Sequence, residues 1–114
     1  MNGVKAYQSR IDVKEYEIFL TADGLPAGEV AWLRNTARDG QTYKAGMWRA
    51  DPSECPYYFA ADETFVMIDG VLRIKLEDGT TLEFSPGDTG SFVKGTNSTW
   101  TVVEPVVHFF IQTT

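Results

Sequence analysis

Cysteine and histidine are almost absent from this sequence, which has one of each, Cys55 and His108. A single cysteine cannot form an internal disulfide, and no Cys-x-x-Cys pair is present to hold zinc. No stretch approaches the roughly 18 apolar residues that span a membrane. Residues 1–13 also lack the apolar run between basic and small residues that marks a signal peptide. We therefore expect a cytoplasmic protein with no membrane partner.

Positive charge is scarce as well. Lys and Arg total 10 against 16 Asp and Glu, which gives a net charge of −6 at pH 7. A nucleic-acid-binding protein needs a basic face to displace counterions from the phosphates, and the scattered basic residues predict no such face. We therefore expect no nucleic-acid partner.

The residues that are abundant are typical of β-structure. Aromatic residues make up 13% of the chain, and flat side chains favour strands. Turn-forming residues recur about every eight to twelve positions, which is the spacing of an all-β sandwich or barrel. No helical period persists, and 114 residues suit one domain spanning 1–114. The sequence predicts about nine strands, at 13–20, 29–34, 42–49, 63–68, 71–76, 80–84, 90–93, 99–103 and 106–111.

The connections between these strands contain clear turn residues. Asp69-Gly70 lies between two apolar runs and predicts a tight hairpin turn, because both turn positions tolerate positive φ. Glu77-Asp78-Gly79 and Ser85-Pro86-Gly87-Asp88 predict two further turns. Asp51-Pro52-Ser53 and Pro56 predict an irregular loop.

Three spacings in the second half of the chain resemble one family. Glu63 is followed seven positions later by Gly70, and Pro86-Gly87-Asp88 is followed by Gly95. The segment Thr-Trp-Thr-Val-Val-Glu-Pro-Val at 99–106 is followed by Phe-Phe-Ile at 109–111. Together they resemble the cupin superfamily of RmlC-like β-barrels. The nearest resemblance is to the short cupins grouped with the ethanolamine-utilisation cupin and ureidoglycine aminohydrolase.

The resemblance implies a single cupin barrel, that is, a double-stranded β-helix or jelly roll. Its core would span about residues 46–112, with extra N-terminal strands before it. The resemblance also implies a homodimer, often formed by exchanging N-terminal strands. The apolar first strand, with Tyr16, Ile18, Phe19 and Leu20, is the candidate edge for that pairing, because unpaired edges need cover.

The family's metal ligands are not matched in this sequence. Counted from Glu63, the positions of the usual histidines fall on Tyr57, Phe59 and Ser98, so only the glutamate of the usual three His and one Glu is present. A transition metal needs three or four converging ligands. We therefore expect no metal and no other cofactor. A rebuilt metal site of Glu63 and His108, with Tyr57 as a phenolate, remains the alternative.

Every second side chain of a strand shares a face, so alternation groups the candidate residues into sets. The cupin resemblance implies that these sets converge on one pocket. The predicted pocket is aromatic, with one carboxylate, one phenol and one imidazole, a composition usual for small-molecule sites. Its members are Tyr57, Phe59, Glu63, Phe65, Met67, Ser98, Trp100, His108 and Phe110.

These features leave three functions open. The first is a metal-free module that binds a small molecule. The second is an enzyme, an isomerase, epimerase or hydrolase-like protein, in which Glu63, Tyr57 and His108 carry acid–base chemistry or hold a rebuilt metal. The third is a structural role through dimerisation. The second requires that Glu63, Tyr57 and His108 share one cavity.

Overall fold

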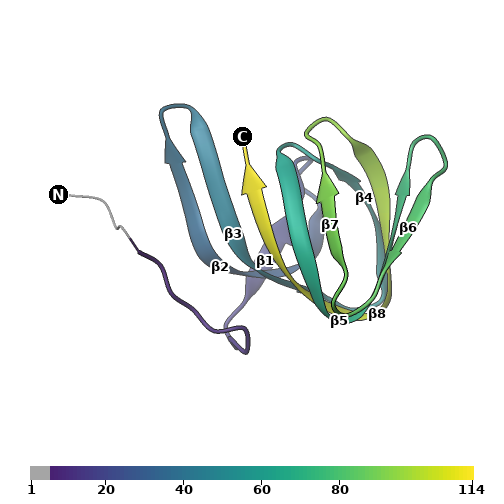
Figure 1. The fold of residues 1–114 in the computed structure, drawn as a ribbon, viewed down its shortest axis with the longest axis horizontal. Helices are drawn as coiled ribbons and strands as arrows, with labels where there is room; N and C mark the ends of the chain where they lie inside the picture. Colours follow the sequence, from purple (N-terminus) through teal and green to yellow (C-terminus); the bar gives the residue numbers. More distant parts are fainter. Residues whose placement is uncertain (1–5) are drawn as a thin grey trace.

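The computed structural model describes residues 6–114, which form one strongly curved antiparallel β-sheet (Figure 1). No helix occurs among these residues, so the all-β prediction is confirmed. The prediction of no signal peptide rests partly on residues 1–5, which lie outside the described residues. The strands are β1 (Glu17–Leu20), β2 (Pro26–Arg38), β3 (Gln41–Ala50), β4 (Ser53–Tyr58), β5 (Asp62–Leu76), β6 (Thr81–Phe84), β7 (Thr89–Phe92) and β8 (Asn97–Thr113).

Strand β8 organises the sheet. Its first half pairs with β4 and its second half with β3, while β5 runs beside it along almost its whole length. The sheet continues outward from β3 to β2 and β1, and from β5 to β6 and β7. Figure 1 shows the two long strands bending together at the base of the barrel, so that their halves face each other across the core.

The expected hairpin at Asp69-Gly70 is wrong, because β5 continues through it as one strand. The register of β5 against β8 shifts three times between Met67 and Leu72, which is a bulge at a barrel corner. Gly70 has a φ of 86°, and a Cβ there would collide with the carbonyl oxygen of Pro105 on β8. The ranges 99–103 and 106–111 likewise form one bent strand. The two mergers remove two of the nine predicted strands and β4 adds one that was not predicted, so residues 6–114 form eight strands.

The expected loop at Pro56 is also wrong, since Pro56 lies inside β4. Strand β4 pairs with β8 alone, and a proline without an N–H is tolerated on such an edge strand. The first strand is shorter than predicted and begins at Glu17 instead of Val13. The two predicted turns are confirmed: Gly79 N donates to Leu76 O at 3.0 Å, and Asp88 N donates to Ser85 O at 2.9 Å.

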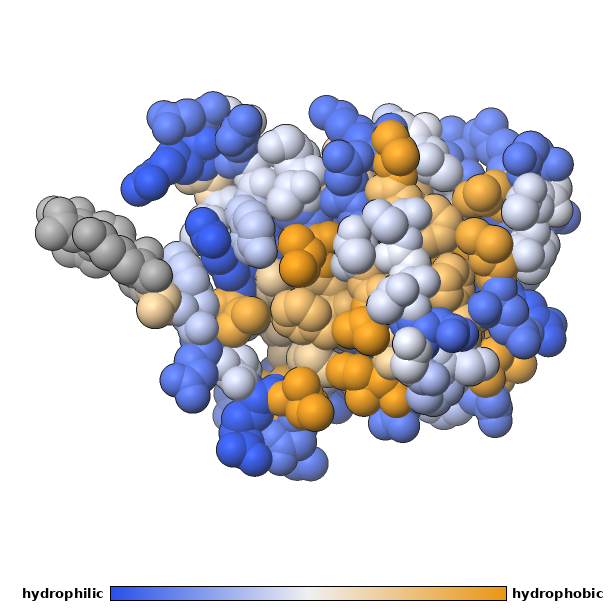
Figure 2. All heavy atoms as spheres, in the orientation of Figure 1, coloured by the Kyte–Doolittle hydropathy of each residue, from blue (hydrophilic) through white to orange (hydrophobic). Residues whose placement is uncertain are grey.

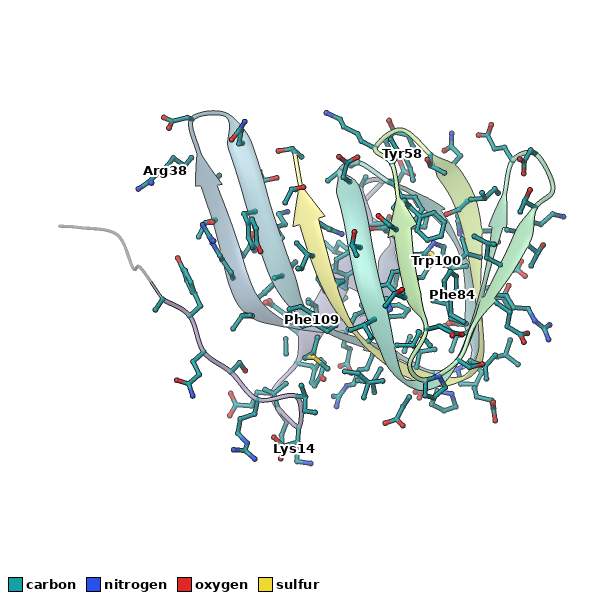
Figure 3. The ribbon with its side chains drawn as sticks, in the orientation of Figure 1. Lys14, Arg38, Tyr58, Phe84, Trp100 and Phe109 are labelled. Atoms are coloured by element: carbon teal, nitrogen blue, oxygen red, sulfur yellow. The ribbon has the colours of Figure 1, made fainter. Side chains whose placement is uncertain are left out.

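The core lies on the concave side of the sheet. Along β5 and β8 buried and exposed residues alternate, and the buried faces meet in one aromatic cluster. Trp100 and Phe84 project into this cluster, whereas Phe109 lies on the outer face (Figure 3). Figure 2 shows apolar side chains gathered in the middle of the face that it presents. No helix among residues 6–114 is long and apolar enough to cross a membrane.

Candidate functional site

A cavity lies in the barrel interior, with walls from β1, β2, β3, β4, β5 and β8. Its volume is about 40 Å³. Its deep end is formed by buried side chains and its outer end by Ser53, which is exposed. The lining residues are Phe19, Ala27, Gly28, Trp48, Ser53, Cys55, Tyr57, Glu63, Trp100, Val102, His108, Phe110 and Gln112.

Three polar side chains from three strands meet in this wall. Tyr57 Oη on β4 donates to Glu63 Oε1 on β5 at 2.8 Å, and Gln112 Nε2 on β8 donates to the same oxygen at 2.8 Å. Gln112 Nε2 also donates to Tyr57 Oη at 3.0 Å. The register explains the meeting, because Glu63 lies directly opposite Gln112 in the ladder between β5 and β8. Both hydrogen bonds fall on Oε1, and among residues 6–114 Oε2 has no partner.

Burial dominates the acid–base properties of this cluster. Desolvation raises the pKa of Glu63 to about 7, although the hydrogen bonds from Gln112 and Tyr57 act in the opposite direction. The pKa of Tyr57 is raised too, first by burial and then by the neighbouring Glu63 carboxylate. At neutral pH, Glu63 is thus divided between its charged and neutral forms, and Tyr57 keeps its proton.

His108 is the other titratable group in the cavity. Its ring stacks on Phe65 with centroids 4.6 Å apart and lies 4.9 Å from the ring of Trp48. Its Nδ1 is buried and has no hydrogen-bond partner among the described residues. Complete burial lowers the pKa of His108 to about 3, so the imidazole is neutral at physiological pH.

The two indoles of the cavity are fixed by hydrogen bonds at their nitrogens. Trp48 Nε1 donates to the carbonyl of Ala27 at 2.8 Å, and Trp100 Nε1 donates to Ser98 Oγ at 3.1 Å. Ser98 Oγ in turn donates to the carbonyl of Tyr57 at 2.7 Å. The Trp48 and Trp100 rings meet edge to face, with centroids 5.5 Å apart. The aromatic wall is therefore rigidly placed.

The structure brings together five of the nine residues predicted for the pocket: Tyr57, Glu63, Trp100, His108 and Phe110. The other four lie behind the lining. Phe59 stacks on Phe92 at 4.7 Å, Phe65 packs against Phe84 and His108, and Met67 is fully buried. Ser98 supports the wall through the two hydrogen bonds just described. These four point inward as alternation predicts, but aromatic packing fills the space in front of them.

Other members of the lining were not among the predicted residues. Gln112 could have been included, because it follows Phe110 by two positions on the same face of a strand. Trp48 and Phe19 had no comparable signal. They reach the cavity through the pairing of β3 with β8 and of β1 with β2, and sequence alone did not indicate those pairings.

Comparisons with known proteins identify the type of domain. The sequence pattern of the EutQ-like cupin domain matches residues 37–110. A DUF861 family protein from Thermotoga maritima is 31% identical, with a TM-score of 0.55, over 56% of this chain and 73% of that one. Ethanolamine utilization protein Q from Salmonella typhimurium LT2 is 18% identical, with a TM-score of 0.66, over 86% and 93%. The EutQ protein of Clostridium difficile is 18% identical, with a TM-score of 0.62, over 84% and 79%. No curated protein matches the sequence.

The residues around the cavity do not fit the metal site that the cupin resemblance implies. Within residues 6–114, no three His, Cys, Asp or Glu side chains are grouped so that they could hold a metal ion. Glu63 and His108 line the cavity, but two ligands fall short of the three or four that a transition metal needs. Tyr57 is a poor third ligand, because its raised pKa and its hydrogen bond to Glu63 both keep the phenol protonated.

Proposed function

This chain belongs to the EutQ-like cupin domain family, and on that premise we propose that it binds a small organic molecule in the cavity at Glu63, without a transition metal. The observation that carries the proposal is a set of fixed aromatic walls around one carboxyl group whose Oε2 has no protein partner among residues 6–114. An apolar cleft with a few convergent polar groups is the usual form of a small-molecule site.

The first experiment tests binding. Protein treated with a chelator is screened against a library of small polar metabolites by NMR, with the indole N–H signals of Trp48 and Trp100 as reporters. A cavity ligand shifts both signals. The matched control is Ser53→Phe, which adds a bulky ring at the exposed end of the lining and should abolish the response. A library without such a ligand, or ligands that bind the Ser53→Phe variant equally well, would contradict the proposal.

The second experiment tests metal independence. We expect far less than one Mn, Fe, Zn or Ni per chain in protein purified without a chelator and without an affinity tag of histidines. We also expect no rise in melting temperature when these metals are added, because binding to the folded state alone would raise it. About one metal per chain, lost in both Glu63→Gln and His108→Leu, would instead establish a rebuilt site.

A second candidate function is acid–base catalysis. It is favoured by one specific observation: Glu63, Tyr57 and His108 all line the same cavity. Glu63 has a pKa of about 7 and an unengaged Oε2, which suits a base that removes a proton next to a carbonyl group. The Tyr57 hydroxyl already donates a hydrogen bond to Glu63, so the role of Tyr57 would be to position the carboxyl group.

Deuterium exchange distinguishes the two functions. If the cavity is catalytic, the hydrogen next to the carbonyl group of a bound compound should exchange with deuterium from the solvent. Glu63→Gln would abolish that exchange. A binding module would leave the ligand unlabelled over the same period. The ligands to test are those found by the NMR screen.

A further inference from the structure

We propose that the ligand of this cavity is a small organic cation that donates hydrogen bonds, such as an ammonium or an amidinium group. This inference rests on the proposed function, because it names the class of molecule that the same cavity takes. It follows from which hydrogen-bonding groups of the lining are already used and which are free.

The side chains of the cavity have almost no free hydrogen to donate. The two indole N–H groups are engaged, and Gln112 Nε2 donates to both Glu63 Oε1 and Tyr57 Oη. The Tyr57 hydroxyl donates to Glu63. Two other lining residues, Ser53 and Cys55, donate to the carbonyls of Asp51 and Pro56. Apart from one N–H of Gln112, the single hydrogen of neutral His108 and the acid form of Glu63, the polar side chains of the lining therefore have no free hydrogen to donate.

The main free acceptor is the carboxyl group of Glu63. Tyr57 and Gln112 both donate to Oε1, which is the arrangement that stabilises an ionised carboxylate. Its second oxygen is left to a ligand, and a hydrogen bond from a cation to a carboxylate is roughly twice as strong as one between neutral groups. A cation at this oxygen would also offset the burial of the negative charge.

No positive side chain lines the cavity to balance an anionic ligand. Arg49, the nearest arginine along β3, is held by Glu29 at 2.9 Å and covers the ring of Tyr16 at 3.9 Å. An anion would therefore face Glu63 inside a chain whose net charge is −6. Aromatic rings, in contrast, attract cations, and the attraction strengthens where water is excluded.

The size of the cavity favours small ligands. The cavity volume of about 40 Å³ is well below the roughly 300–1,000 Å³ of a pocket for a drug-sized molecule, so small probes are appropriate. Acetamidinium, acetamide and acetate share one small planar shape and differ in charge and in the number of hydrogens they donate. They form a matched series of probes.

The test titrates each probe into the full chain at about pH 8, one unit above the pKa of Glu63, and follows the Trp48 and Trp100 indole signals by NMR. We expect acetamidinium to bind at least about tenfold more tightly than acetamide, a difference of about 1.4 kcal/mol, and acetate not to bind. Glu63→Gln should bring the affinities for acetamidinium and acetamide within about twofold of each other. Glu54→Gln on the exposed side of β4 is the matched carboxylate control and should change nothing.

The wild-type comparison stands even if a variant fails to fold. Tighter binding of acetamide or acetate in the cavity would overturn the cation inference and leave the proposed function intact. If none of the three binds, the inference is overturned as well. The metabolite screen then decides the proposed function separately, since a cavity ligand without positive charge would support it and no ligand at all would contradict it.

Discussion

Tyr57 Oη donates a hydrogen bond to Glu63 Oε1 across 2.8 Å and so links β4 to β5, two strands that do not pair with each other in the sheet. Gln112 on β8, which pairs with both strands, bonds to both side chains. These three hydrogen bonds hold the Glu63 carboxyl group so that Oε1 accepts from Tyr57 and Gln112, and among residues 6–114 Oε2 has no partner. They therefore moderate the effect of burial on the pKa of Glu63 and leave Oε2 as the oxygen available to the proposed ligand.

The first prediction concerns the acidity of Glu63 in Tyr57→Phe. This change removes one of the two hydrogen bonds that favour the charged carboxylate, while the burial that disfavours it remains. The pKa of Glu63 should therefore rise above its present value of about 7. A titration of the side-chain carboxyl carbon by NMR measures it. Tyr58→Phe, the next residue and an exposed one, is the control and should leave the pKa unchanged; a fall in Tyr57→Phe would contradict the account.

Alternation along strands explains how much of the site could be predicted. The cupin resemblance implies that Glu63 points into the barrel, and alternation then assigns Phe65 and Met67 to the same face. Alternation also groups His108 with Phe110 and Gln112 on one face. Alternation gives the face of a side chain but not its depth. Phe65 and Phe110 both point inward, yet only Phe110 reaches the cavity, because Phe84 and His108 pack against the ring of Phe65.

Two of the errors in the strand prediction have one physical origin. Asp-Gly and Pro are turn signals on the local scale, but both can also serve within long strands whose partners are distant in sequence. Gly70 allows β5 to bend against Pro105 of β8, and Pro56 lies on an edge where no N–H is needed. Pro105 lies 35 positions after Gly70, and the residues of β4 pair with residues of β8 that lie still further along the chain. A local sequence pattern does not show which distant strand will be the partner.

A second prediction follows from the bend in β5. Gly70 and Gly79 have almost the same φ, 86° and 90°, but an added Cβ would strike the Pro105 carbonyl at Gly70 and meet nothing within 4 Å at Gly79. Both alanine variants should lose about 1–3 kcal/mol from the strained backbone. Gly70→Ala should lose clearly more in urea denaturation, because β5 and β8 must also move apart. Equal losses of unfolding free energy in the two variants would show that the bend of β5 at Gly70 can adjust to the added Cβ.

A third prediction concerns oligomeric state. Strand β1 is at the edge of the sheet and exposes Ile18 and Leu20, with 65% and 57% of their surfaces accessible. Since apolar edge strands need cover, we expect a homodimer of about twice 12.7 kDa by size exclusion with light scattering. Replacing Ile18 and Leu20 together by Lys should give a monomer. Val93→Lys, at another exposed apolar position, should remain a dimer, and a wild-type monomer at high concentration would contradict the prediction.

The last prediction concerns stability against pH, where Glu63 and His108 act in opposite directions. The folded-state pKa of Glu63 is about 7 against an ordinary 4.5, so between these values the folded chain holds the extra proton and stability falls as pH rises. The folded-state pKa of His108 is about 3 against 6.5, so between these values the unfolded chain holds the extra proton and stability rises with pH. The two slopes, each about 1.4 kcal/mol per pH unit, oppose each other where the windows overlap.

The difference in stability between each single variant and wild type should therefore report the titration of the group that the substitution removes. Relative to wild type, Glu63→Gln should gain about 3 kcal/mol of unfolding free energy as the pH is raised through the Glu63 window. His108→Leu, compared in the same way, should lose stability as the pH rises through the His108 window. Urea denaturation at a series of pH values measures both, and the difference from wild type cancels the remaining titratable groups. Curves that run parallel to wild type would mean that neither burial perturbs its group, and the acid–base account of the cavity would then be wrong.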